Sequence, residues 1–227
     1  MARALGYQFL NDVGAEFRVL PGTMDLLHRV KRPENLSLPE VIAACDVQNP
    51  LLGNRGTARV YSAQKGADGH EVEILETAMH HLAEVCGASL QVDHRDVAGA
   101  GAAGGLGYGL LTFCNARIQP GFDLVASTMH LAERIAAADL VITGEGRLDD
   151  QTLDGKGPAG VAAAARKAGK RVLAFTGAAT EAAERSGIFD CIVPIADRPL
   201  SLESAMAEGE LLLERAAART ACLLNWG

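Results

Sequence analysis

The sequence predicts an α/β protein with a parallel sheet in its C-terminal part and a second, loop-rich α/β domain before it. From residue 139 onward, short apolar runs rich in β-branched residues alternate with alanine-rich helical stretches, the pattern of a parallel sheet with right-handed crossovers. Aromatic residues make up only 4% of the chain, which favours packed helices and glycine loops over a β-sandwich. We therefore expect two domains, at residues 1–123 and 124–227.

The C-terminal part has the clearer pattern of elements. Each apolar run is followed by a helical stretch, and glycines end two of the helices. Ser201 is expected to cap the last helix. The expected strands are residues 140–143, 171–176 and 189–195, and the expected helices are residues 124–137, 158–168, 178–186 and one that follows Ser201.

The first part is more irregular. A helix is expected at residues 72–86, where apolar side chains recur on one face. Residues 49–69 are expected to form a loop. The remaining expected elements are a short helix at 1–10, strands at 17–20 and 41–47, and a helical turn at 24–30.

Composition excludes several classes of protein. The net charge of −7 argues against a general nucleic-acid binder, although it leaves room for a local phosphate site. The five cysteines are widely spaced and include no CxxC pair, which is typical of buried thiols in a reducing compartment. Neither a signal peptide nor an apolar run of about 18 residues is recognisable. We expect a cytoplasmic protein that binds neither nucleic acid nor membrane.

Three polar, glycine-containing loops are candidates for chemistry, at residues 46–69, 99–109 and 144–160. Backbone N–H groups with lysine and arginine suit phosphate oxygens, and carboxylates suit Mg²⁺ or a base that accepts a hydroxyl proton. This combination favours phosphoryl transfer to a small polar acceptor. The alternative is that the charges form ion pairs on the surface. The cations are Lys65, Arg147 and Lys156, and the carboxylates are Asp46, Glu145, Asp149 and Asp150.

Two nucleotide-binding motifs are only approximated. Gly99, Gly101 and Gly104 fit G-x-G-x-x-G, but the charged residues 91–97 before them make a poor buried strand. The glycine run could instead allow close helix packing, or offer N–H groups at a helix start to an anion. The Walker A comparison fails, because Asp150 stands where its first glycine should be.

Four motifs in order resemble the type 1 (bacterial) glycerate kinase family. They are Cys45-Asp-Val-Gln-Asn-Pro-Leu51, Gln64-Lys-Gly-Ala67, Gly99-Ala-Gly-Ala-Ala-Gly-Gly-Leu-Gly107 and Thr143-Gly-Glu-Gly-Arg-Leu-Asp149, the last followed by Gln151-Thr152 and by Gly155-Lys-Gly-Pro-Ala-Gly-Val161. The resemblance implies phosphorylation of D-glycerate by ATP with Mg²⁺. It also implies two α/β domains, one Rossmann-like and one intervening, with the site in the cleft between them.

The sequence departs from the family pattern in several places. Tyr61-Ser-Ala63 replaces an aromatic-Gly-Pro, and Gly53-Asn-Arg-Gly-Thr57 replaces a Gly-Pro-x-Gly-Ala. The resemblance covers the C-terminal portion of the family only, so the N-terminal part of the family fold is expected to be missing. Three functions stay open: an active kinase, a non-catalytic fragment or ligand-binding module, and an NAD(P)-dependent oxidoreductase based on the glycine run.

The candidate site residues come from all three loops. No metal ligand is assigned, and which carboxylate is the base stays open. A sheet edge left uncovered by the missing portion would favour pairing with another chain, so we expect a homodimer. The catalytic candidates are Asp46, Lys65, Glu145, Arg147 and Asp149, and the substrate- or nucleotide-binding candidates are Asn49, Gln64, Gly101, Gly104, Gly105, Gly144, Gly146, Gln151 and Lys156.

Overall fold

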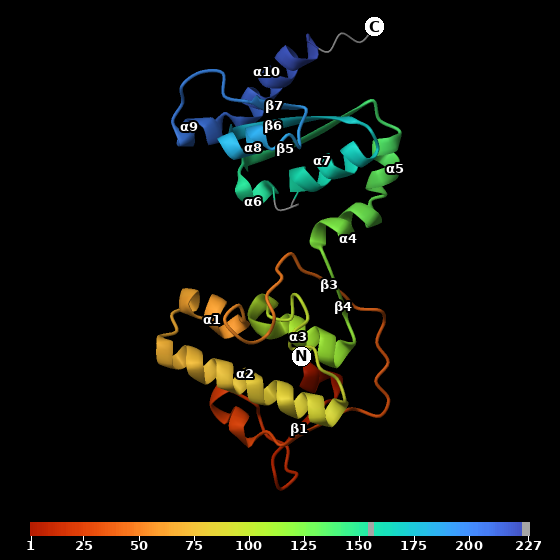
Figure 1. Ribbon diagram of the computed structural model, residues 1–227, viewed down its shortest axis with the longest axis vertical. Coiled ribbons are helices and arrows are strands. Elements are labelled where there is room, and N and C mark those ends of the chain that lie inside the picture. The colour runs from red at the N-terminus through yellow and green to blue at the C-terminus, as the bar shows by residue number, and fades with distance from the viewer. Residues whose placement is uncertain (154–156, 224–227) are drawn as a thin grey trace. The chain divides into compact units, whose positions relative to one another are not determined.

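The computed structural model describes residues 1–153 and 157–223 and has a mixed α/β fold with parallel sheets, as the sequence predicts (Figure 1). The chain divides into two compact units, Met1–Gly121 and Phe122–Gly227. The expected boundary at residue 123 lies close to this division, and the roles assigned to the two domains stay predictions. No helix in the described part of the chain is both long and apolar enough to cross a membrane.

The first unit begins with short elements, where the predicted helix at residues 1–10 is wrong. Only η1, Ala2–Leu5, is helical, and it ends at Gly6 with a φ of 90°. Strand β1, Gln8–Leu10, then pairs antiparallel with β2, Arg29–Lys31, which follows the 3₁₀ helix η2, Pro21–Leu26. Residues 17–20 are loop rather than strand. The pairing buries Phe9 and Val30, and such long-range pairing overrides local helical spacing.

The first unit also contains the helices α1, Thr57–Tyr61, α2, Gly69–Leu90, and α3, Ala102–Cys114. The predicted helix at 72–86 is confirmed and longer, because Asp68 and Glu71 form a capping box at its start. The loop predicted at 49–69 is partly wrong, since α1 and the 3₁₀ turn η3, Ala63–Lys65, lie within it.

The core of the first unit joins η1, β1, β2, α2 and α3. Burial raises the pKa of the Cys86 thiol to about 11. The expectation of buried thiols holds for Cys86 but is wrong for Cys191 and Cys222, which are exposed. Strand β3, Ile42–Ala44, pairs in parallel with β4, Arg117–Gln119, and is shorter and more exposed than the buried strand predicted at 41–47. The fully buried side chains in the core of the first unit include Leu27, Leu51, Cys86 and Tyr108.

The second unit contains the predicted parallel sheet. Strands β5, Leu140–Leu148, β6, Arg171–Ala179, and β7, Cys191–Pro194, are parallel and adjacent in that order. The predicted helix at 124–137 is two helices, because His130 adopts a left-handed φ of 53°. The helices are α4, Gly121–Thr128, α5, Leu131–Ala136, α6, Asp150–Leu153, α7, Gly157–Lys167, α8, Glu181–Arg185, α9, Leu202–Ala207, and α10, Gly209–Ala221.

The two faces of the sheet differ because side chains alternate along each strand. Val141, Val172 and Ala174 join the small side chains of α7 in one buried cluster. On alternate positions, Ile142 and Phe175 line a groove of about 460 Å³ together with α10. The alanine-rich sequence of α7 allows this helix to pack closely on the strands.

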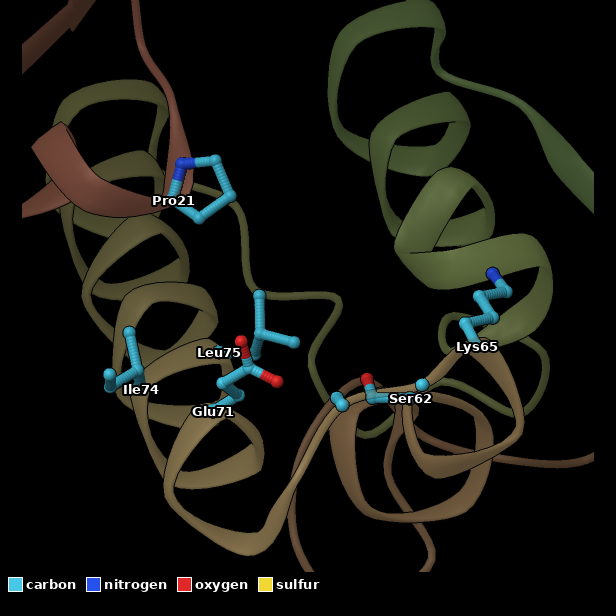
Figure 2. A pocket seen from close by; sticks show the side chains of 8 residues that line it. Pro21, Ser62, Lys65, Glu71, Ile74 and Leu75 are labelled. Carbon is cyan, nitrogen blue, oxygen red and sulfur yellow. The ribbon is translucent and has the colours of Figure 1, made fainter.

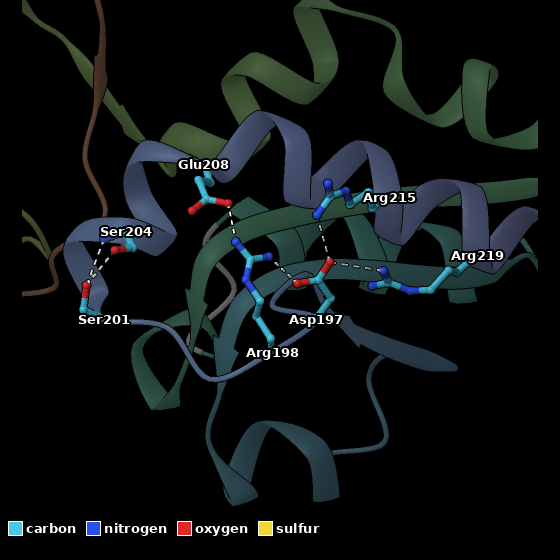
Figure 3. Close-up of polar contacts among 7 residues, drawn as sticks. All are labelled: Asp197, Arg198, Ser201, Ser204, Glu208, Arg215 and Arg219. Atoms are coloured by element: carbon cyan, nitrogen blue, oxygen red, sulfur yellow. Dashed lines mark hydrogen bonds and ion pairs between the residues drawn. The ribbon is translucent and has the colours of Figure 1, made fainter.

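Ion pairs join the segment that follows β7 to α10 and to the residue just before it (Figure 3). Asp197 contacts Arg198 at 2.8 Å and Arg215 at 3.4 Å, and the hydrogen bond from Arg198 leads the interactions that lower the pKa of Asp197. Arg198 also reaches Glu208 at 2.6 Å. The predicted cap is confirmed, since the Ser201 hydroxyl accepts the Ser204 N–H at 3.2 Å.

Candidate functional site

The polar stretch after residue 143 begins as a strand, and the expectation of a loop from Gly144 is wrong. β5 continues to Leu148 because it pairs with β6 from Leu140↔Arg171 to Leu148↔Ala179. Close packing explains the glycine at position 144, since a Cβ there would lie 2.6 Å from the Phe175 carbonyl oxygen. Gly146 presents its carbonyl oxygen to Gly177, where a Cβ would again lie 2.6 Å away.

Four polar side chains lie together at the carboxyl end of β5, the place where α/β sheets bind ligands. Arg147 Nε is 3.4 Å from Asp149 Oδ2, and the Arg147 side chain is 69% exposed. Glu145 Oε2 accepts a hydrogen bond of 2.9 Å from the Thr152 hydroxyl. We call Glu145, Arg147, Asp149 and Thr152 the β5 polar end. This arrangement presents a cation and a carboxylate on the strand and a second carboxylate directly after it.

Thr152 is the member of this group that the sequence reasoning missed. It is 4% exposed, although it stands in a charged and glycine-rich segment. The available signal was its place inside the family-like run 143–152. Lys156 and the side chain of Gln151 lie outside the described part of the chain.

Two of the predicted residues in the first unit have structural partners. Asp46 follows β3, and its Oδ1 accepts the Gly121 N–H at the start of α4 at 2.8 Å. The Asn49 side-chain amide donates to the Arg55 carbonyl at 2.7 Å and accepts from the Tyr61 hydroxyl at 2.8 Å. The Asn49 contacts hold the loop that precedes α1, and the Asp46 contact joins the segment after β3 to the start of α4. The structure thus adds a scaffold role to both predicted site residues.

The glycine run opens α3, but not as a row of unused N–H groups. The Gly101 N–H donates to the Asn49 carbonyl at 2.9 Å, and the Gly105 N–H points to the Gly101 carbonyl at 3.4 Å. A Cβ at Gly101 would lie 2.2 Å from the Pro50 carbonyl oxygen, so close packing requires this glycine. The Gly101 N–H is thus already used within the fold, and its role in binding an anion stays a prediction.

The same run also fails as a dinucleotide fingerprint. Residues 91–97, all described, are loop and turn, so no strand leads into the glycines as the motif requires. Ala103, Gly104 and Gly105 adopt left-handed φ values of 51°, 74° and 85°. This tight turn brings the backbone of Gly104 to the surface beside Lys65.

Lys65 lies at a groove of about 530 Å³ in the first unit. Its Nζ is 3.8 Å from the position that a Cβ on Gly104 would occupy. Figure 2 shows Glu71 and Leu75 on α2 at one side of the groove and Lys65 at the other, beside the start of α3. Gln64 is exposed on the same 3₁₀ turn as Lys65. The Lys65 ammonium is thus available to a ligand that enters this groove.

Metal binding finds limited support in the described side chains. They include no group of three histidine, cysteine, aspartate or glutamate residues placed to hold a metal ion. A Mg²⁺ ion that accompanies a nucleotide needs only one or two carboxylates, because the phosphates and water supply its other ligands. Glu145 and Asp149 are carboxylates of this kind at the β5 polar end.

Known proteins resemble this chain over almost its full length. A model of the glycerate kinase family matches residues 1–225. A glycerate kinase of Halalkalibacterium halodurans is 39% identical over 232 residues, which cover 100% of this chain and 61% of that protein. The glycerate 2-kinase of Escherichia coli K12 is 39% identical over 184 residues, 80% of this chain and 48% of that protein.

A solved structure agrees with the sequence comparison. The crystal structure of a Salmonella typhimurium LT2 protein provisionally named glycerate kinase 2 superposes with a TM-score of 0.79 at 34% identity. The match covers 98% of this chain and 60% of that protein, so the chain spans about three fifths of the length of such relatives. The family model, the sequence relatives and the shared fold agree, and the chain belongs to the glycerate kinase family.

Proposed function

We propose that this protein phosphorylates D-glycerate, with ATP as the phosphate donor and Mg²⁺ as the accompanying ion. The observation that carries the proposal is the β5 polar end, where carboxylates and an exposed arginine stand at the end of a parallel strand. Family membership supports the reaction class, because several relatives are named glycerate kinase.

Each candidate residue has a role that its chemistry supports. Arg147 and Lys65 are exposed cations that bind the anionic groups of substrate or nucleotide. Glu145 and Asp149 hold the ion or accept the hydroxyl proton. A bound Mg²⁺ would neutralise charge on the transferred phosphoryl group. A cytoplasmic location and a homodimer stay predictions.

The test is an assay of ADP release with D-glycerate and ATP. The variant Arg147→Met removes the charge and should lower kcat/KM by about 100-fold, the usual scale for losing one group that stabilises transition-state charge. Arg185→Met is the matched control, because Arg185 is also an exposed arginine of the second unit and pairs with Glu181 within α8. It should retain the activity.

Two results would contradict the proposal. Turnover that stays at background for the unaltered protein would favour the alternative, a ligand-binding module without catalysis. An Arg147→Met variant as active as Arg185→Met would remove the β5 polar end from the reaction.

A further inference from the structure

Thr152 is the buried centre of the β5 polar end. Its hydroxyl oxygen lies 2.9 Å from Glu145 Oε2, 3.3 Å from the Asp149 backbone nitrogen and 3.4 Å from the Arg147 carbonyl oxygen. One hydroxyl thus contacts the Glu145 carboxylate and the backbone of Arg147 and Asp149. It is 4% exposed, whereas Glu145 and Arg147 are exposed.

The chemistry of a hydroxyl assigns a direction to each contact. A threonine has one proton to donate and two lone pairs that accept. The Asp149 N–H donates to the oxygen, and the proton goes to Glu145, because a carboxylate is the stronger acceptor and lies nearer than the Arg147 carbonyl. The hydroxyl therefore holds the backbone turn at Asp149 and the Glu145 side chain together.

We propose that Thr152 is a positioning residue, which orients the Glu145 carboxylate for the reaction. The proposal rests on the proposed function, since orientation matters only if the β5 polar end takes part in phosphoryl transfer. An exposed glutamate samples several rotamers, and fixing one before the reaction avoids that ordering cost during the chemical step. The buried Thr152 hydroxyl supplies this restraint through its hydrogen bond to Glu145 Oε2, and it leaves the other carboxylate oxygen of Glu145 for a ligand.

A purely structural role for Thr152 makes a different prediction. If the residue only fills space, Thr152→Val should be tolerated, because valine has nearly the same shape. If the hydroxyl orients Glu145, Thr152→Ser should keep the activity, because serine retains the hydroxyl, and Thr152→Val should lower it. A loss in kcat with unchanged KM would further indicate an effect on the reaction rather than on substrate binding.

The experiment measures ADP release with D-glycerate for Thr152→Val, Thr152→Ser, Glu145→Ala and the double variant Thr152→Val/Glu145→Ala. We expect Thr152→Val to lower kcat by about 10- to 100-fold, the scale of a small misplacement, with Thr152→Ser within about threefold of the unaltered protein. When Glu145 is already replaced by alanine, adding Thr152→Val should lower kcat by less than about twofold. Thr220→Val is the matched control, because the Thr220 hydroxyl donates to the Ala216 carbonyl within α10.

The outcomes separate this inference from the proposed function. If the unaltered protein is active and Thr152→Val is equally active, or Thr152→Ser is as impaired as Thr152→Val, the inference is overturned and the proposed function stands. If the unaltered protein is inactive, the proposed function fails. The unfolding equilibrium constant is then measured for the same single and double variants at Thr152 and Glu145. A coupling of about threefold or more would then support the Thr152–Glu145 contact, and a smaller one would overturn it.

Discussion

Individual polar residues of this protein divide into those that hold the scaffold and those that are available to a ligand. The Asp46 carboxylate accepts a helix-start N–H, and the Asn49 amide bridges Arg55 and Tyr61. Lys65 and Arg147 instead present exposed cations. We therefore expect the two cations to report on ligand binding, and Asp46 and Asn49 to report on stability as well.

The Asp93 carboxylate offers a test of local electrostatics. Hydrogen bonds from the Arg95 side chain, and then from its backbone N–H, lower the pKa of Asp93 to about 2. A lowered pKa stabilises the folded state above the unfolded value near 3.9, and this contribution is lost as the pH falls to about 2. The carboxylate is 53% exposed, so the effect on stability is small.

An NMR titration of the Asp93 carboxyl carbon checks this prediction. Its midpoint should lie near pH 2, and Arg95→Ala should raise it toward about 3.9. Arg59→Ala removes a different ion pair, with Glu73, and should leave the midpoint unchanged. A midpoint near 3.9 in the unaltered protein would contradict the contact.

At the scale of elements, glycines allow β5 and β6 to stay paired through their polar ends. A Cβ at Gly144 or Gly177 would stand 2.6 Å from a carbonyl oxygen of the neighbouring strand. Real Cβ atoms do not approach so closely, so any side chain here must push the strands apart. The position of Arg147, which is paired with Ala178, depends on this close approach.

The variant Gly177→Ala should therefore weaken the sheet next to the candidate site. We expect the free energy of unfolding to fall by about 1–3 kcal/mol, the usual cost of overpacking, as measured by urea denaturation. Gly209→Ala is the control, because a Cβ at the start of α10 has no neighbour within 4 Å. It should be neutral, or stabilising by up to about 1 kcal/mol. Equal midpoints for the two variants would contradict the close packing.

At the scale of the whole molecule, each unit has its own hydrophobic cluster. Leu27 belongs to the cluster of the first unit and Leu148 to that of the second, and the two clusters have no member in common among the described residues. Both leucines are at most 1% exposed. Changes in one cluster should therefore have little effect on packing in the other.

Substitutions in the two clusters are expected to add. Leu27→Ala and Leu148→Ala should each lower the free energy of unfolding by about 2–5 kcal/mol, because each leaves a cavity in a packed core. The loss in the double variant should equal the sum within about 0.5 kcal/mol, measured by denaturant titration. If the units unfold in separate transitions, each substitution should move only one of them. A double variant that departs from the sum by more than 1 kcal/mol would show that the cores are coupled.

Much of the second unit could be predicted from its residues in order. Buried parallel strands are uniformly apolar and their crossover helices begin and end at recognisable signals, such as the Ser201 cap and the glycine after α7. The motif at residues 143–149 likewise indicated both the family and the position of the candidate site. These features depend on neighbours along the chain, so local patterns are sufficient to find them.

Other features depend on residues far apart in the chain, and no local pattern contains them. Gln8–Leu10 is a strand because it pairs with Arg29–Lys31, although its spacing suited a helix. Gly144–Leu148 is a strand for the same reason, since its backbone hydrogen bonds go to β6 despite its polar side chains. Thr152 became a candidate through its burial under Glu145. Backbone pairing and burial arise from contacts between segments, and the folded structure is where they can be observed.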